Sequence, residues 1–136
     1  MKGVQLGSII EEFNLEILCR TEHCEQRMVT TEEIIRPGLP LRGFFEHFNP
    51  ERLQVIGRVE TTYLQSIPKE ERLERLDQYF SYDMPAVVIS RNMEPLPELM
   101  EMAKKHDRTV LRTSMATAEL IRSMLTYLSY ELARCV

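Results

Sequence analysis

The chain takes its architecture from residues 36–64, which read RPGLPLRGFFEHFNPERLQVIGRVETTYL. This stretch opens with a turn, because Pro37 fixes its own φ and Gly38 tolerates a positive φ. Further along, the apolar run Leu53–Ile56 is stopped by Gly57. A short apolar run that ends at a glycine predicts a buried strand that leads through a tight turn into a helix.

An aromatic cluster lies between the turn and the strand. Phe44, Phe45 and Phe48 are three of the chain's five phenylalanines, and Gly43 beside them permits close backbone approach. Pro50 ends the cluster. We expect these aromatic side chains to form a shaped surface, and one hypothesis for the chain is a protein-interaction module that uses Phe44, Phe45 and Phe48.

Helical and strand-like patterns alternate on both sides of this stretch. Before it we expect a helix over 6–13, a strand over 15–19, a polar surface loop over 20–27, and short strands over 28–30 and 34–35. After it we expect helices over 59–67 and 69–80, a strand over 85–90, a helix over 96–103, a strand over 109–111 and a long final helix capped by Ser114. This alternation predicts one α/β domain over residues 1–136, with a mostly parallel or mixed sheet and helices on both faces.

The composition excludes several classes of protein. A net charge of −4 argues against non-specific binding to nucleic acid or to an anionic membrane. No apolar run approaches the ~18 residues of a membrane span, and acidic residues stand where a signal peptide would have its apolar centre. We therefore expect a cytoplasmic protein. The three cysteines are an odd number at spacings that match no disulfide framework or common zinc site, so free thiols and no metal are expected.

Arginines follow each of the three best predicted strands. They are Arg58, Arg91 and Arg112, and Arg112 precedes the hydroxyl groups of Thr113 and Ser114. In an open α/β sheet the carboxyl ends of parallel strands meet at one edge, where helix N-termini also favour anions. One hypothesis is therefore a site at this edge for a phosphate- or carboxylate-bearing small molecule, with Arg36 reaching the same edge. The alternative is that these arginines pair with some of the 21 acidic side chains.

A nucleotide-binding loop is absent from the sequence. The five glycines, at positions 3, 7, 38, 43 and 57, form neither G-x-x-x-x-G-K-[ST] nor G-x-G-x-x-G. Without such a loop, the chain has no evident means of holding ATP for phosphoryl transfer. Taken alone, the sequence does not predict a kinase.

Several motifs nevertheless resemble one family throughout the chain. They are Arg36-Pro37-Gly38-Leu39, Gly43-Phe44-Phe45, Asn49-Pro50-Glu51-Arg52, Val55-Ile56-Gly57-Arg58 with Glu60, Pro85 to Arg91, and Val110 to Thr113. These motifs make the chain similar to the N-terminal domain of bacterial HPr kinase/phosphorylase. The resemblance implies a fold similar to the N-terminal domain of Mur ligases. It also implies structural roles for Pro37, Gly38, Gly43, Phe44, Phe45, Pro50, Arg52, Gly57 and Glu60.

The resemblance also implies a parent protein with two activities. Such a parent uses ATP or pyrophosphate to phosphorylate a serine of the phosphocarrier protein HPr, and it removes that phosphate by phosphorolysis. It acts in carbon catabolite repression and the phosphotransferase system as a cytoplasmic hexamer, and its P-loop, ATP and Mg²⁺ belong to a C-terminal catalytic domain. The present chain would then be a non-catalytic regulatory or assembly domain. Its partners would be its own C-terminal kinase domain, neighbouring subunits and, through the parent, HPr. The alternative is a stand-alone domain that senses a phosphorylated sugar or a nucleotide-like anion.

Overall fold

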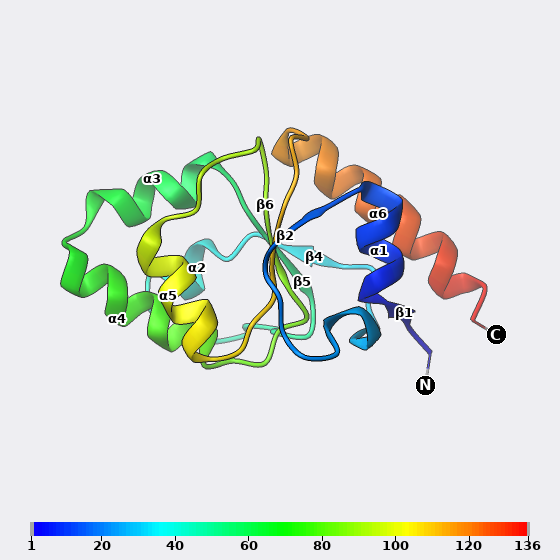
Figure 1. The fold of residues 1–136 in the computed structure, drawn as a ribbon, viewed down its shortest axis with the longest axis horizontal. Coiled ribbons are helices and arrows are strands. Elements are labelled where there is room, and N and C mark those ends of the chain that lie inside the picture. The colour runs from blue at the N-terminus through cyan, green and yellow to red at the C-terminus, as the bar shows by residue number, and fades with distance from the viewer. Residues whose placement is uncertain (1, 136) are drawn as a thin grey trace.

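The computed structural model describes residues 2–135, which form a five-stranded mixed sheet between two layers of helices (Figure 1). The strand order is β2–β7–β6–β5–β4, in which β4 to β7 are parallel and β2 is an antiparallel edge strand. These strands are β2 (Glu16–Cys19), β4 (Ile34–Ile35), β5 (Leu53–Ile56), β6 (Val87–Ile89) and β7 (Val110–Arg112). A separate antiparallel pair joins β1 (Val4–Gln5) to β3 (Met28–Val29).

Helices cover both faces of the sheet (Figure 1). On one face lie α2 (Gly38–Leu41), α3 (Arg58–Ser66), α4 (Lys69–Phe80) and α5 (Pro97–Lys105). On the other face lie α1 (Leu6–Phe13) and α6 (Thr117–Ala133), and the 3₁₀ turn η1 (Cys24–Gln26) packs beside α1. The predicted α/β architecture is therefore confirmed.

The central strand β5 shows why the fold needs two helical layers. All four of its residues are buried. Leu53 and Val55 belong to the core beneath α1 and α6, whereas Ile56 belongs to the core beneath α3, α4 and α5. Alternate side chains of a strand point to opposite faces, so a strand that is apolar at both parities requires cover on both sides. Gln54, also buried, accepts a hydrogen bond from the hydroxyl of Tyr79 at 2.9 Å.

Most predicted elements are confirmed, and their ends shift by one to three residues. The helices over 6–13 and 69–80 and the strands over 34–35 and 53–56 have the bounds expected. The polar loop over 20–27 is a partial exception, because it contains η1 and buries Cys24. The prediction that Ser114 caps the final helix is wrong. The N-cap is Ala116, two residues later, and Ser114 is exposed.

The turn at the start of the 36–64 stretch differs from its prediction in one respect. Gly38 has no positive φ; it begins α2, and its N–H donates to the carbonyl of Arg36 at 2.8 Å. The chain reverses at Pro37 instead, with φ −82° and ψ 50°. At Gly43 the φ is +90°, and a Cβ there would lie 2.1 Å from Nη1 of Arg75. The expected close approach at Gly43 is therefore confirmed.

The aromatic cluster is mostly a packing unit. Phe45 stacks on Tyr82 with ring centroids 4.7 Å apart, and Phe48 meets the same ring edge-on at 5.2 Å. Both phenylalanines are half-buried against the core, and only Phe44 of the predicted trio is exposed. The predicted aromatic surface is therefore present only in part, because Tyr82, which follows α4, covers much of Phe45 and Phe48.

Two other family-motif residues secure the approach to β5. Pro50 lies in a turn that the Arg52 N–H closes onto the Asn49 carbonyl at 3.4 Å. The guanidinium of Arg52 then pairs with Glu33, which immediately precedes β4. This ion pair ties the segments that enter two neighbouring parallel strands.

Residues 2–135 contain three free cysteines, of which Cys19 and Cys24 are buried and Cys135 is exposed. The same residues include no group of three His, Cys, Asp or Glu side chains placed to hold a metal ion. No helix in this part of the chain is long and apolar enough to cross a bilayer.

Candidate functional site

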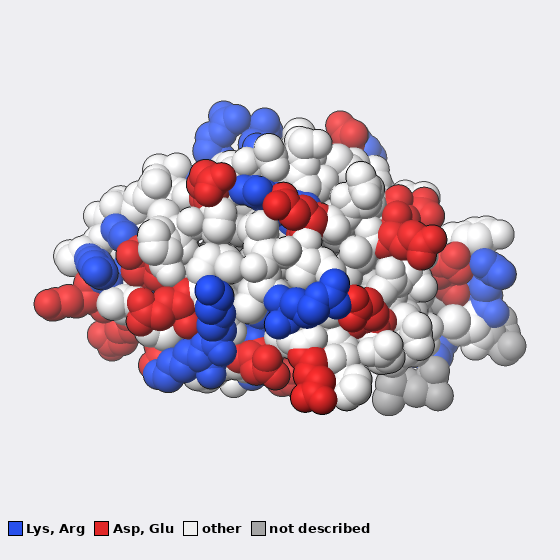
Figure 2. Space-filling view, viewed as in Figure 1, with Lys and Arg blue, Asp and Glu red and all other residues white. Residues whose placement is uncertain are grey.

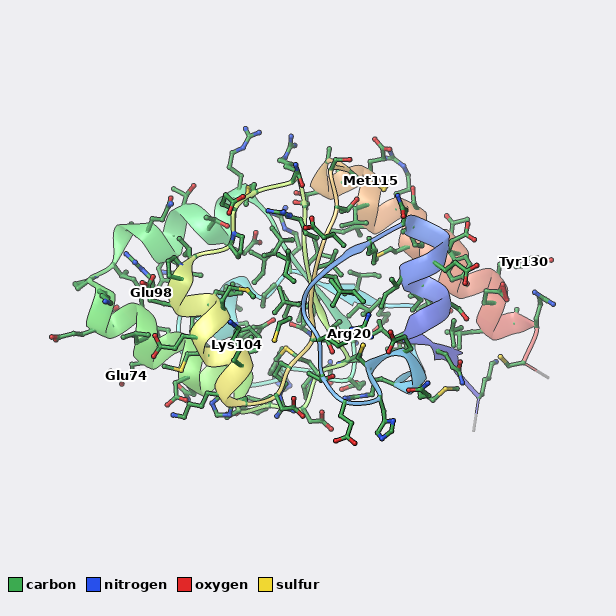
Figure 3. The ribbon with its side chains drawn as sticks, viewed as in Figure 1. Arg20, Glu74, Glu98, Lys104, Met115 and Tyr130 are labelled. Carbon is green, nitrogen blue, oxygen red and sulfur yellow. The ribbon has the colours of Figure 1, made fainter. Side chains whose placement is uncertain are left out.

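The carboxyl ends of β5, β6 and β7 meet at one edge of the sheet, as the sequence predicts. Ile56 pairs in parallel with Ile89, and Ile89 pairs with Arg112. The segments that follow these strands therefore emerge together, beside the first turns of α3 and α6 at the top of Figure 1. Met115, labelled in Figure 3, lies at this edge just before α6.

An ion pair between an exposed arginine and a buried glutamate occupies the first turn of α3. Arg36 donates from Nε and Nη2 to the two carboxylate oxygens of Glu60, both at 3.0 Å. The same carboxylate accepts the N–H of Gly57 at 2.8 Å and so caps the helix. Glu60 is only 5% exposed. This bidentate geometry explains how two distant motifs of the chain, Arg-Pro-Gly and Gly-Arg-x-Glu, depend on each other.

A second polar pair lies behind the ion pair. The hydroxyls of Ser90, just after β6, and Thr117, at the start of α6, are 2.5 Å apart and buried. A Cβ added to Gly57 would lie 2.6 Å from Thr117 Oγ1, 3.2 Å from Ser90 Oγ and 3.2 Å from Arg36 Nη2. Gly57 is therefore required here for close approach of the backbone to three polar side chains.

The loop after β6 is held to the loop after β7. Arg91 and Asn92 both adopt left-handed backbone conformations, with φ of 57° and 51°. Their N–H groups donate to the carbonyls of Met115 (2.8 Å) and Thr113 (2.7 Å). Non-glycine residues in this region are uncommon. The two hydrogen bonds stabilise the unusual conformation, which leaves the Arg91 side chain exposed at the edge.

The predicted anion-binding residues divide into two groups. Arg36 pairs with Glu60, and Arg112 pairs with Glu16 and Glu94 and donates to the Met93 carbonyl. Hydrogen bonding to Glu16 raises the pKa of Arg112. For these two arginines the alternative reading, pairing with acidic side chains, describes the structure.

Arg58 and Arg91 are exposed and have no ion-pair partner among residues 2–135. Figure 2 shows Lys and Arg side chains projecting at the top of the molecule, where the β6–α5 loop lies in Figure 1. Thr113 is buried and its hydroxyl accepts the Met115 N–H at 3.3 Å, while Ser114 is exposed. Of the four arginines predicted at this edge, therefore, only Arg58 and Arg91 lack an ion-pair partner among residues 2–135.

The electrostatics of this edge limit what it can do. The Glu60 carboxylate already lies at the N-terminus of α3, where the helix dipole would otherwise favour a bound anion. Ser90 and Thr117 bond to each other, so neither is oriented by a base as a nucleophile would be. The arrangement can attract an anion to its rim through Arg58 and Arg91, but it presents no nucleophile–base pair.

Sequence reasoning missed a further ion pair, between the half-buried Arg72 and the buried Glu98, below this edge. Arg72 in α4 donates to Glu98 of α5 at 2.8 Å, and also to the carbonyls of Leu64 (2.7 Å) and Ile67 (3.2 Å) at the end of α3. Glu98 is 8% exposed and is labelled in Figure 3. No local signal marks Arg72, because its partners come from other elements and its charge run reads as a solvated helix face.

Hydrogen bonding from Arg72 lowers the pKa of Glu98. A carboxyl group with a lowered pKa in the folded state contributes stability above its unfolded pKa of roughly 4.3, and that stability is lost as pH falls through the folded value. We therefore expect the urea concentration at the unfolding midpoint to decrease as the pH is lowered below about 4. This decrease should be smaller in Glu98→Gln, which has no carboxyl group to protonate at this position. Urea unfolding at a series of pH values tests this. An unchanged pH slope in Glu98→Gln would show that Glu98 is not responsible.

The fold and this geometry define a class of protein. It is a small α/β domain in which polar side chains at the carboxyl ends of the parallel strands pair with one another, as Arg36 does with Glu60 and Ser90 with Thr117. The family described as "HPr Serine kinase N terminus" matches residues 4–128. The chain belongs to this family, and the resemblance seen in its motifs is thereby confirmed.

Curated relatives agree with this assignment. The chain is 39% identical over 133 residues to the HPr kinase/phosphorylase of Caldanaerobacter subterraneus subsp. tengcongensis. The aligned region covers 98% of the chain and 43% of that protein. It is also 39% identical over 131 residues to the HPr kinase/phosphorylase of Clostridium beijerinckii, covering 96% of the chain and 43% of that protein. The chain thus spans less than half the length of these relatives.

One solved structure has a related fold. It contains the CBS and DRTGG domains of the regulatory region of Clostridium perfringens pyrophosphatase, complexed with the activator diadenosine tetraphosphate. The TM-score is 0.63 and the sequence identity is 16%, with 94% of this chain and 50% of that chain covered. At this identity the similarity concerns the fold alone.

Proposed function

We propose that this chain is a non-catalytic regulatory and assembly domain of an HPr kinase/phosphorylase. The observation that carries the proposal is the family match over residues 4–128, in a sequence without a P-loop pattern. A domain of this kind acts by positioning a catalytic partner rather than by chemistry of its own. Its partners would be a C-terminal kinase domain, neighbouring subunits and HPr, in the cytoplasm. ATP and Mg²⁺ would bind in the catalytic domain, because this chain lacks a loop to hold a triphosphate.

A domain exchange tests the proposal. The 133 aligned residues of the Caldanaerobacter relative are replaced by this chain, and the chimera is compared with the intact relative and with its remaining C-terminal part alone. We expect the chimera to resemble the intact relative in oligomeric state and in the rate of HPr phosphorylation. A chimera that matches the C-terminal part alone in both properties would contradict a regulatory or assembly role.

A second candidate function is sensing of a small phosphorylated metabolite. The observation that favours it is the exposed pair Arg58 and Arg91 at the carboxyl edge of a parallel sheet, where α/β domains bind ligands. Thermal denaturation with ATP, fructose bisphosphate, inorganic phosphate and sulfate tests it. Saturable stabilisation that is lost in Arg58→Ser/Arg91→Ser supports sensing. No stabilisation at millimolar concentration, or stabilisation that the double variant retains, argues against it.

A further inference from the structure

A pocket of about 390 Å³ opens at the edge of the sheet opposite to the carboxyl edge. It is lined by residues from segments 21–27, 83–85 and 107–109, which leave β2 or enter β6 and β7 at the bottom of Figure 1. The hydroxyls of Thr21 and Thr109, 2.9 Å apart, join two of these segments. We call this hollow the β2–β7 pocket. Its volume falls within the range of small-molecule sites, roughly 300–1,000 Å³.

One wall of the β2–β7 pocket carries excess positive charge. Nη1 of Arg27 and Nη1 of Arg108 lie 2.9 Å and 3.4 Å from the same atom, Oδ1 of Asp83, so two guanidiniums share one carboxylate. Arg108 also donates to the carbonyls of Phe80 and Ser81, which hold its guanidinium in place. Both hydrogen bonds that the Arg27 side chain makes within residues 2–135 come from Nη1. Its Nε and Nη2 therefore remain for a further acceptor.

The rim of the β2–β7 pocket carries negative charge. Asp107 is exposed and has no ion-pair partner among residues 2–135. Glu22 is also exposed, and its recorded partner is the adjacent His23 at 3.4 Å. Asp107 and His23 both have left-handed backbone conformations, with φ of 58° and 60°, which are uncommon for residues other than glycine. The pocket therefore presents opposite charges on its wall and on its rim.

The floor of the β2–β7 pocket is apolar. Cys24, Met84 and Pro85 line it and are buried, the first two with 2% and 1% of their surface exposed. Burial raises the pKa of the Cys24 thiol, so this group stays neutral near pH 7. An apolar floor beneath a few polar groups is typical of sites for small molecules.

We propose that the β2–β7 pocket binds a small zwitterion, an α-amino acid with an apolar side chain. The carboxylate of the ligand accepts hydrogen bonds from Nε and Nη2 of Arg27, the two-pronged arrangement that guanidinium and carboxylate groups favour. Its ammonium group lies toward Asp107 and Glu22, and its side chain lies over Met84 and Pro85. A simple anion would match only the arginine wall, and a simple cation only the acidic rim. A zwitterion matches both.

This inference goes beyond the proposed function, because the pocket and the Arg58–Arg91 pair lie at opposite edges of the sheet. The two sites are tested with different ligands and different variants. Failure of the amino-acid site would leave the domain exchange and the metabolite-sensing test unchanged.

An NMR titration of the isotope-labelled chain tests the proposal, with each of the standard amino acids as a probe. We expect at least one amino acid with an apolar side chain to shift the amide signals of residues 21–27, 83–84 and 107–109 saturably, with a Kd of about 1 mM or tighter. No saturable shift with any amino acid up to about 10 mM, or shifts confined to other parts of the chain, would overturn the proposal.

Two analogues of the amino acid that binds show which of its groups are recognised. The amino acid amide lacks the carboxylate, and we expect it to bind about 10-fold or more weakly, because hydrogen bonds between charged groups are lost. The corresponding hydroxy acid lacks the ammonium group, and we expect it to bind about 3-fold more weakly, because ion pairs with exposed side chains contribute less. An analogue that binds as tightly as the amino acid would overturn the assignment of a zwitterion.

Substitution of Arg27 tests the proposed contact. Arg27→Gln should weaken binding by about 10-fold or more, and Arg27→Lys should fall between this variant and the unchanged chain, because lysine keeps the charge without the planar fork. Arg122→Gln, an equal change at an exposed site on α6, is the matched control and should leave binding unchanged. Unchanged affinity in Arg27→Gln would contradict the proposal.

A second variant keeps the test decisive if circular dichroism shows that Arg27→Gln is unfolded. Asp107→Asn changes an exposed side chain, and asparagine readily adopts the left-handed conformation found at this position. We expect it to remain folded and to weaken binding of the amino acid by about 3-fold. Binding of the hydroxy acid, which has no ammonium group, should not weaken. Equal weakening of both ligands would contradict a contact between Asp107 and the ammonium group.

Discussion

Arg72→Ala is expected to lower the free energy of unfolding by about 3–5 kcal/mol, because removing one member of a buried ion pair leaves the other charge buried and unpaired. The charge left behind is Glu98, 8% exposed, which accepts from Arg72 at 2.8 Å. The substitution also removes the donor to the carbonyls of Leu64 and Ile67, which end α3. A small domain has a total stability of about 5–15 kcal/mol, so this loss is a large fraction of it.

Chemical denaturation monitored by circular dichroism measures the effect of Arg72→Ala. Arg134→Ala is the control, since Arg134 makes a solvent-exposed pair with Glu131 and should change stability by less than about 0.5 kcal/mol. Arg72→Lys should fall between the two, because lysine keeps the charge but lacks the planar fork that reaches several acceptors. A loss below about 1 kcal/mol for Arg72→Ala would mean that the α3–α4–α5 layer does not depend on this pair.

Gly57→Ala is expected to cost about 2–4 kcal/mol, the sum of overpacking and a disturbed buried hydrogen bond. The added Cβ would lie 2.6 Å from Thr117 Oγ1, so the Ser90–Thr117 hydroxyl pair must move. Its distance to Arg36 Nη2 would be 3.2 Å, which crowds the bidentate bond to Glu60 as well.

Gly38→Ala provides a matched control for Gly57→Ala. A Cβ at Gly38 would meet nothing within 4 Å, and Gly38 lies in α2 without a positive φ. This control should be neutral or stabilising by up to about 1 kcal/mol. Thr117→Ala should partly rescue Gly57→Ala by removing the obstructing hydroxyl. Equal effects of the two glycine substitutions in a thermal melt would refute the close approach at Gly57.

Apolar patterns predicted the elements of this fold well, because their signals are local. The i, i+3, i+4 stripe of residues 6–13 and the four-residue run of β5 each fixed an element to the residue. The start of α6 was missed because serine is a residue type that commonly caps helices, which made Ser114 the expected N-cap. In the structure the carbonyl of Met115 accepts the Arg91 N–H, and the N-cap is Ala116. The turn residue Gly38 was misjudged because Pro37 alone completes the reversal.

The candidate site could be predicted only in part, because charge pairing is not local in sequence. Parallel strands with arginines at their ends correctly indicated that Arg58, Arg91 and Arg112 share one edge. No pattern in the sequence revealed that Glu16, 96 residues away, would neutralise Arg112. Glu60 was named only as a family-motif residue, although a glutamate three residues after the strand-ending Gly57 is a helix-capping signal.

Incubation of the purified chain with HPr, Mg²⁺ and labelled ATP tests whether the chain is non-catalytic, with pyrophosphate as a second phosphoryl donor and an intact HPr kinase/phosphorylase relative as the positive control. We expect no label on HPr from this chain, and label with the relative under the same conditions. Phosphoserine on HPr formed by this chain alone, at a rate that follows its concentration, would contradict a non-catalytic role.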